Sequence, residues 1–328
     1  MSRPWLLAYL VFIAGAMSAA APVRLVFDTD IGNDIDDALA LAMIHGLESR
    51  GEVTLLAVTV SKDNRWAAPY VDIVNTFYQR PDIPIGAVRD GKTRDDGNYV
   101  RQICESGLYP HRLTDGRKTV DAVQLLRRVL SAESDGAVVI VQTGFSTNLA
   151  CLLESPPDAI SPLAGRDLML RKVRLISMMG GNFATSSGGE YNIVNDIDAA
   201  KTLFRECPVP IVVSGYELGK RILYPARSIE KDFGYVPHHP IAEAYRLYDR
   251  MPYDRPTWDL TSVLYAARPD ASFHVSEPGQ MEVTDQARIT FTPHTRGLHR
   301  YLRATQQQCD RALNAMTQLV AMRPNAPR

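Results

Sequence analysis

Short apolar runs and amphipathic stretches alternate along most of the chain. Runs rich in β-branched residues predict strands, and apolar residues spaced three or four positions apart predict helices. The expected strands are Val23–Phe27, Thr54–Val60, Ala137–Gln142, Val173–Met178 and Val209–Val213. The expected helices among them are Ala38–Leu47, Ala67–Tyr78, Asp121–Leu130 and Asp198–Arg205. This alternation favours an α/β fold with a doubly wound, mostly parallel open sheet of the Rossmann-like kind, covered on both faces.

The last third of the chain is less regular. It predicts helices near Ile241–Tyr248 and over Asp259–Ala267, a hairpin from Glu282–Asp285 and Ala287–Thr292, and a closing amphipathic helix over Leu302–Met322. The tail from Arg323 to Arg328 is expected to fray. Because no repeat, low-complexity tract or linker interrupts the pattern, residues 21–328 are expected to form a single domain.

The first twenty residues have the layout of a signal peptide. Arg3 precedes an apolar run from Trp5 to Met17, and the small residues Ser18 and Ala20 would satisfy a cut after Ala20. A retained membrane anchor is the alternative, but the run is shorter than the roughly 20 residues that a span needs. We therefore expect residues 1–20 to be removed and the mature protein to be periplasmic or secreted.

Composition narrows the possible partners. The chain has 328 residues, 45% of them hydrophobic, with 36 basic against 37 acidic residues and a net charge of −1. That apolar fraction suits a globular protein, and the balanced charge gives no global attraction to nucleic acid or to an anionic membrane. Cys104, Cys151, Cys207 and Cys309 could pair in an oxidising compartment, but their spacing does not indicate which pairs would form. We expect Cys151 and Cys207 to be free and buried, and no CxxC pair or His-rich cluster suggests a zinc site.

The ten residues Asp28–Asp37 carry five aspartates directly after the first predicted strand. In an open α/β sheet, ligands bind at the carboxyl ends of the strands. Carboxylates crowded there repel one another, and a hard divalent cation relieves that repulsion. Gly32 gives the loop the backbone freedom to wrap around an ion. The passage therefore predicts a metal site.

Three alternative kinds of acidic loop fit this passage less well. An acidic turn in which Asp36 caps the next helix accounts for only one of the aspartates. An EF-hand loop that starts at Asp28 requires Gly at its sixth position and Glu at its twelfth, where this chain has Asn33 and Leu39. A phosphatase of the haloacid dehalogenase type also places two aspartates after its first strand, although it does not need the Asp36–Asp37 pair and has Thr or Val where Gly32 stands.

The passage Asp28–Ala38 resembles the N-terminal signature of the calcium-dependent nucleoside hydrolases, the inosine-uridine preferring family, with about two more residues between Gly32 and the aspartate pair. Further segments resemble the family in the same order along the chain. These are Thr143–Ala150, which reads Thr-Gly-x-x-Thr-Asn-Leu-Ala, then Gly180–Asn182 with Glu190–Asn192, and finally Trp258-Asp259. Together the segments span most of residues 21–328, so the ordered set is more specific than any one motif.

The resemblance implies roles for individual residues. Calcium would be held by the carboxylates of Asp30, Asp37 and Asp259 and by the main-chain carbonyl of Thr143, an all-oxygen set that suits this ion. Asp30 would also act as the catalytic base toward a calcium-bound water. The ribose would be held by Asp36, Asn182, Glu190 and Asn192, with Asn64 as a further candidate, whereas Asn148 is expected to be a helix cap.

The implied reaction is hydrolysis of the N-glycosidic bond of a ribonucleoside, through a sugar that gains positive charge. The best-known members have His just before the late metal aspartate, but this chain has Trp258. The family's purine-specific branch also has Trp there and stacks it on the base, so the residue favours purines. Packing in the core accounts equally well for Trp258. His111, His238 and His239 are further candidates for a proton donor, although surface histidines are common.

The resemblance also implies a homo-oligomer, either a dimer or a tetramer. Two rival functions remain open at this point. One is a hydrolase of the same fold that acts on another ribosyl compound. The other is a non-catalytic binder of nucleosides or sugars, which the presence of Asp30, the implied base, disfavours.

Overall fold

A central sheet of eleven strands organises the protein in the computed structural model, which describes residues 21–183, 188–269 and 273–325. The predicted signal peptide lies outside these residues. The strand order is β12-β11-β13-β7-β6-β5-β1-β2-β3-β4, and β10 pairs with β13. The strands are β1 (Val23–Thr29), β2 (Val53–Lys62), β3 (Ile85–Lys92), β4 (Val120–Asp121), β5 (Val138–Gln142), β6 (Val173–Met179), β7 (Ile211–Ser214), β10 (His274–Val275), β11 (Gly279–Val283), β12 (Ile289–Pro293) and β13 (His299–Arg303). A separate pair joins β8 (Leu223–Tyr224) to β9 (Arg255–Pro256).

The sheet is mostly parallel, as predicted. All pairs from β4 across to β7, and the pair of β7 with β13, are parallel, whereas β10, β11 and β12 pair in antiparallel fashion at one edge. The chain winds from β1 to β2 and β3 on one side and returns to β5, β6 and β7 on the other. The point where the order reverses lies between β1 and β5, which is where open α/β sheets bind ligands.

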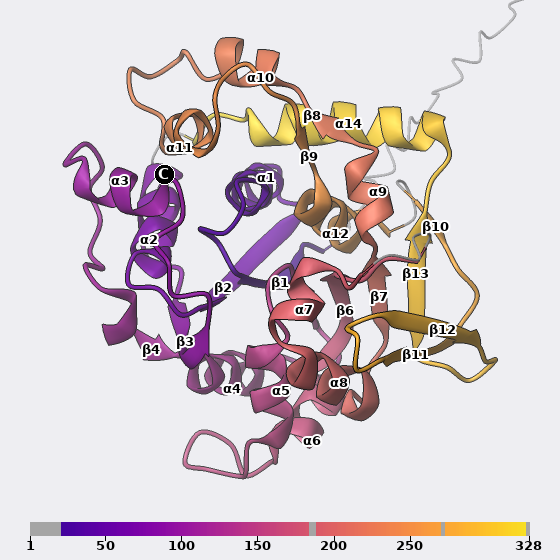
Figure 1. The fold of residues 1–328 in the computed structure, drawn as a ribbon. Helices are drawn as coiled ribbons and strands as arrows, with labels where there is room; N and C mark the ends of the chain where they lie inside the picture. Colours follow the sequence, from indigo (N-terminus) through magenta and orange to yellow (C-terminus); the bar gives the residue numbers. More distant parts are fainter. Residues whose placement is uncertain (1–20, 184–187, 270–272, 326–328) are drawn as a thin grey trace, which may run out of the picture.

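Helices cover both faces of this sheet (Figure 1). One face carries α1 (Asp36–Ser49), α2 (Ala67–Phe77), α12 (Trp258–Ala267) and α14 (Gln306–Val320), and the other carries α4 (Ala122–Ala132), α5 (Thr147–Glu154), α6 (Gly165–Lys172) and α8 (Ile197–Glu206). The shorter helices are α3 (Val100–Glu105), α7 (Tyr191–Asn195), α9 (Tyr216–Lys220), α10 (Ala226–Lys231) and α11 (Pro240–Tyr248). Leu25 and Phe27 of β1 pack into one core and Val26 into the other, which explains why the middle of the strand is a continuous apolar run.

Most predicted elements are confirmed within a few residues, and the C-terminal helix is the main correction. The sequence pattern predicts a start at Leu302, but α14 begins at Gln306, where Thr305 and Gln308 form a capping box. Leu302 instead belongs to β13, which adds to the sheet beside β7. Both the strand and the helix are amphipathic, so hydrophobic spacing alone does not separate them.

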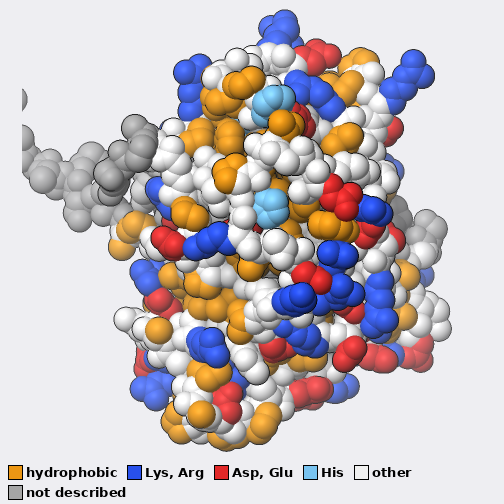
Figure 2. Space-filling model, turned by 90° about the vertical axis from the view of Figure 1, so that its left-hand side faces the viewer, with side chains coloured by type: hydrophobic (Ala, Val, Ile, Leu, Met, Phe, Trp, Pro, Cys, Tyr) orange, Lys and Arg blue, Asp and Glu red, His pale blue; other side chains and the backbone are white. Residues whose placement is uncertain are grey.

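All four cysteines are free in the structure. Cys207 is buried, as expected, but Cys151 is exposed, so its predicted burial is wrong: α5 turns that position toward solvent. Within the described ranges, no helix has the length and apolarity needed to cross a membrane. On the face drawn in Figure 2, acidic and basic side chains are interspersed, in keeping with the balanced net charge.

Candidate active site

A cavity of about 610 Å³ opens at the carboxyl ends of β1 and β5. That volume is within the range of pockets for small molecules. Its lining consists of Asp30, Asn33, Asp34, Asp36, Asp37, Thr143, Met179, Asn182, Gly189, Glu190, Tyr191, Asn192, Tyr216, Lys220, Tyr248, Trp258 and Asp259. The structure therefore brings together all the site residues proposed from the sequence except Asn64.

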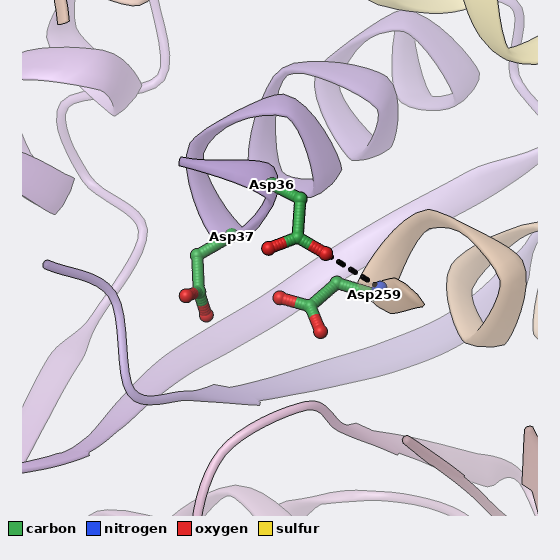
Figure 3. A group of neighbouring side chains, drawn as sticks. All are labelled: Asp36, Asp37 and Asp259. Atoms are coloured by element: carbon green, nitrogen blue, oxygen red, sulfur yellow. Dashed lines mark hydrogen bonds between the residues drawn. The ribbon is translucent and has the colours of Figure 1, made fainter. Parts of the chain in front are cut away.

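Three buried carboxylates form the deepest part of this lining (Figure 3). Asp36 and Asp37 come from the first turn of α1, and Asp259 comes from the first turn of α12. One oxygen of each lies within 4.8 Å of the others. The Asp259 backbone N–H donates to Asp36 Oδ2 at 3.0 Å, and the Thr29 hydroxyl donates to Asp37 Oδ1.

Burial raises the pKa of all three carboxyls well above the usual range, and the neighbouring negative charges raise it further. Such a group is costly to keep ionised without a counter-charge. Oxygen donors in this arrangement match the preference of a hard divalent cation. The donor set therefore fits the metal site predicted from the sequence, with Asp36 beside the expected ligands.

Asp30 lies in the same cavity but outside this group of three. Burial raises its pKa to about 6, while Asn33 and Lys62 oppose the rise. Asn33 Nδ2 donates to Asp30 Oδ2 at 2.7 Å, and the Lys62 ammonium donates to Asn33 Oδ1. A lysine can only donate, so Lys62, which is fully buried, fixes the orientation of the Asn33 amide. Asp30 is thereby held with one oxygen bonded and the other available.

The loop after β1 approaches the loop after β5 very closely. A Cβ on Gly144 would lie 2.5 Å from the Asp30 backbone nitrogen and 2.3 Å from Ser61 Oγ, so only glycine fits there. This contact holds Thr143, the residue before Gly144, next to the loop that begins at Asp30. Asn192 Nδ2 donates to the Thr143 carbonyl at 2.7 Å, and that oxygen keeps a second lone pair for another partner.

Glu190 and Asn182 enter from the loop between β6 and α7. The Glu190 side chain caps α7 by accepting from the backbone N–H groups of Asn192 and Ile193, and it also accepts from Gly181 at 3.1 Å. Burial raises the pKa of Glu190 to about 7. Asn182 Nδ2 donates to the Gly188 carbonyl at 3.3 Å.

Asp28, the first aspartate of the motif, does not line the cavity and instead bonds to residues of two neighbouring elements. It is fully buried, its Oδ1 accepts from Asn148 Nδ2 at 2.7 Å and from Thr59 Oγ1 at 2.5 Å, and burial raises its pKa to about 7. The expectation that Asn148 caps its helix is therefore wrong. Its amide ties the start of α5 to the end of β1.

Aromatic side chains form the outer rim of the cavity. The rings of Trp258 and Tyr216 stack with centroids 5.5 Å apart, and Trp258 Nε1 donates to the Tyr216 carbonyl at 3.0 Å. The Arg255 guanidinium lies 5.2 Å from the Trp258 ring centroid and pairs with Asp34 through both of its carboxylate oxygens. Tyr248 completes this side of the rim, with its ring 4.9 Å from the same guanidinium.

Asn64 does not reach the cavity, so the structure does not support its predicted contact with the sugar. Its Nδ2 donates to the carbonyls of Arg94 and Asp95, and its Oδ1 accepts from the Trp66 backbone N–H at 2.7 Å. The reason is that β2 extends to Lys62, which leaves Asn64 in the following turn, where its amide holds the 94–96 loop.

The candidate histidines also lie elsewhere. His239 is buried and caps α11, and burial lowers its pKa to about 3. His238 pairs with Glu243 at 2.8 Å, and His111 Nδ1 lies 2.9 Å from the Tyr109 carbonyl. None of these three belongs to the described lining of the cavity.

Eight residues of the described lining have no role predicted from the sequence: Asn33, Asp34, Met179, Gly189, Tyr191, Tyr216, Lys220 and Tyr248. Asp34 stands within the aspartate passage, so its place in the cavity follows from the same signal. Tyr216 and Lys220 follow β7, which the sequence pattern predicts over Val209–Val213, and the rule that strand ends bind ligands could have found them. Tyr248 ends α11, and nothing in its local sequence indicates the site.

The family model of the inosine-uridine preferring nucleoside hydrolases matches residues 25–320. The chain belongs to this family. A pyrimidine-specific ribonucleoside hydrolase RihA from Enterobacter sp. (strain 638) is 31% identical over 219 residues, which make up 63% of this chain and 64% of that protein. The match thus spans slightly less than two thirds of that relative's length.

Two solved structures share the fold. A purine-preferring ribonucleoside hydrolase from Gardnerella vaginalis has a TM-score of 0.69 at 18% identity, covering 91% of this chain and 98% of its own. An inosine-uridine preferring nucleoside hydrolase from Bacillus anthracis has a TM-score of 0.67 at 17% identity, covering 91% and 99%. The doubly wound arrangement predicted from the sequence is thus the nucleoside hydrolase fold.

Proposed function

We propose that the protein is a calcium-dependent ribonucleoside hydrolase, which cleaves the N-glycosidic bond to give a free base and ribose. One observation carries the proposal: Asp30, Asp36, Asp37 and Asp259 converge on a single cavity at the switch point of the sheet. Family membership supports the same reaction.

Asp30, Asp37, Asp259 and the Thr143 carbonyl would hold the ion, with Asp36 at its edge. When bound, Ca²⁺ supplies positive charge that offsets these carboxylates and makes a ligating water more acidic. The chain's own residues perform the remaining steps.

Asp30 accepts the proton of the attacking water through the carboxylate oxygen that Asn33 leaves available. Asp36, Glu190, Asn182 and Asn192 lie where they can bind the ribose hydroxyls, and the carboxylates among them stabilise positive charge that develops on the sugar.

A preference for purines is part of the proposal and rests on Trp258, which lines the outer cavity and offers an aromatic surface to a base. The similar proteins point in both directions, since one is a pyrimidine-specific hydrolase and another is purine-preferring. We also propose export to the periplasm or the medium after cleavage behind Ala20, and assembly as a dimer or tetramer.

The test is a base-release assay with inosine, adenosine, guanosine, uridine and cytidine, run on protein stripped of divalent cations and again after Ca²⁺ is restored. Release that requires Ca²⁺ and is faster with purines supports both the calcium-dependent reaction and the purine preference. Nucleoside binding without release would identify a binder instead. Release at full rate without any divalent cation would remove calcium from the proposal.

A further inference from the structure

Cleavage of an N-glycosidic bond leaves its electron pair on the departing base. A proton donor beside the base lowers the cost of this step, commonly by 10²–10⁴-fold in rate for a well-placed acid. The three histidines that are candidates for this role do not belong to the described lining of the cavity. If the protein has the proposed function, a proton donor that belongs to the protein would have to be another residue of the described lining.

Lys220 is the only residue with a cationic side chain in the described lining of the cavity. It ends α9, it is exposed, and its Nζ lies 5.2 Å from the centroid of the Tyr216 ring. Tyr216 in turn stacks on Trp258. The ammonium group therefore stands beside the aromatic rim of the cavity.

The position of α9 is tightly constrained. A Cβ on Gly219 would lie 2.4 Å from the Cα of Trp258 and 2.5 Å from its Cδ1, so the two backbones touch at this glycine. Lys220 is the next residue, and it is thus held beside the residue that precedes Asp259. The other nearby cation, Arg255, is already bound to both carboxylate oxygens of Asp34 and does not line the cavity.

We propose that Lys220 is a catalytic residue that protonates the departing base, a role that rests on the proposed function. The oxygen of water bonds to C1′ of the ribose and gives its proton to Asp30. The bond from C1′ to the base nitrogen breaks, and its electron pair stays on the base. Lys220 gives a proton to an acceptor atom of that base, such as N7 of a purine or O2 of a pyrimidine, and regains a proton from solvent. The preferred substrates are thus ribosides whose leaving group needs such a proton.

The test compares two leaving groups in the full-length, calcium-loaded protein. Inosine or uridine, whichever the wild type cleaves faster, needs base activation, whereas p-nitrophenyl riboside releases a stable anion. Lys220→Met keeps most of the aliphatic side chain and removes the charge. We expect it to lower kcat on the nucleoside by about 10²-fold and to change kcat on p-nitrophenyl riboside by less than about threefold. Lys220→Arg, which retains a cation, should recover part of the nucleoside activity.

Lys231→Met is the matched control, because Lys231 is exposed at the end of α10 and outside the cavity lining, and it should leave both substrates unaffected. Equal losses on the two substrates in Lys220→Met, or no loss on the nucleoside, would overturn the role of Lys220 while the hydrolase stands. A wild type that releases base from no nucleoside would overturn the proposed function itself, and the role of Lys220 with it.

Discussion

The two ends of the cavity are built differently. The inner end consists of buried oxygen donors supplied by loops at the ends of central strands and by the first turns of two helices. The outer rim consists of partly exposed aromatic rings and one lysine, carried by short helices. The inner end has the groups to bind a cation and activate water, and the rim has the groups to contact a base. Activation of water and contact with the base would thus fall to separate parts of one cavity.

The largest effect is expected at the inner end. Asp30→Asn removes the proposed base but keeps an amide that can still hydrogen-bond, so kcat should fall by about 10³-fold on every substrate, including p-nitrophenyl riboside. Steady-state kinetics on both substrate types measure this. Asp90→Asn is the control, because Asp90 is exposed and its φ of 52° is one that Asn tolerates. A loss of activity on nucleosides alone, with p-nitrophenyl riboside unaffected, would mean that Asp30 acts on the departing nucleobase and not on the attacking water.

The affinity for Ca²⁺ should depend only on the buried oxygen donors at the inner end and not on the residues of the rim. Asp37→Asn removes a charged oxygen donor, and we expect Ca²⁺ affinity to fall at least about 10–100-fold, the loss typical even of a group that only supports a ligand. Calorimetric titration of Ca²⁺ into the stripped protein measures this directly, without reference to turnover. Trp258→Ala, at the rim, should leave the calcium affinity unchanged. Equal affinity in Asp37→Asn and wild type would exclude Asp37 as a ligand.

At the rim, Trp258→Ala should lower activity on substrates that carry a purine base and leave the hydrolytic step itself unaffected. Loss of stacking is worth about 1–3 kcal/mol, so purine nucleosides should lose roughly ten- to a hundredfold in kcat/KM, while p-nitrophenyl riboside changes little. Trp258→Phe, which keeps an aromatic face, should lose less. Equal losses on both substrates would mark Trp258 as a packing residue, in keeping with its contacts to Tyr216 and Arg255.

The smallest expected effect concerns stability. Burial raises the pKa of Glu190 from 4.5 to about 7, so the folded protein binds this proton more tightly than the unfolded chain. The protonated Glu190 side chain therefore makes its whole contribution to the free energy of unfolding below pH 4.5, and this contribution is lost as the pH rises toward about 7. In cation-free buffer, the stability of Glu190→Gln relative to wild type should therefore increase as the pH is raised from 4.5 to about 7. Urea unfolding at several pH values measures the difference, and a constant difference would contradict it.

The inner end and the rim also differ in how much of each could be predicted from the sequence. Strands buried on both faces are continuous apolar runs, and the aspartates follow one of them directly, so the fold and the inner end could be predicted from local pattern. The rim could be predicted only in part: Trp258 follows from the family resemblance and Lys220 comes after a predicted strand, whereas Tyr248, at the end of α11, carries no local signal for the site. Asn64, by contrast, lies outside the described lining, because β2 extends two residues beyond its predicted end to Lys62 and leaves Asn64 in the following turn.

The contact between Gly219 and Trp258 has a practical consequence for altering the substrate range. Since the two backbones touch there, α9 and the start of α12 cannot shift independently, and any side chain at position 219 would push on the residue adjacent to Asp259. A library aimed at new leaving groups should therefore keep position 219 constant, together with Lys220 as the proposed proton donor, and vary Tyr216 and Tyr248, which line the rim.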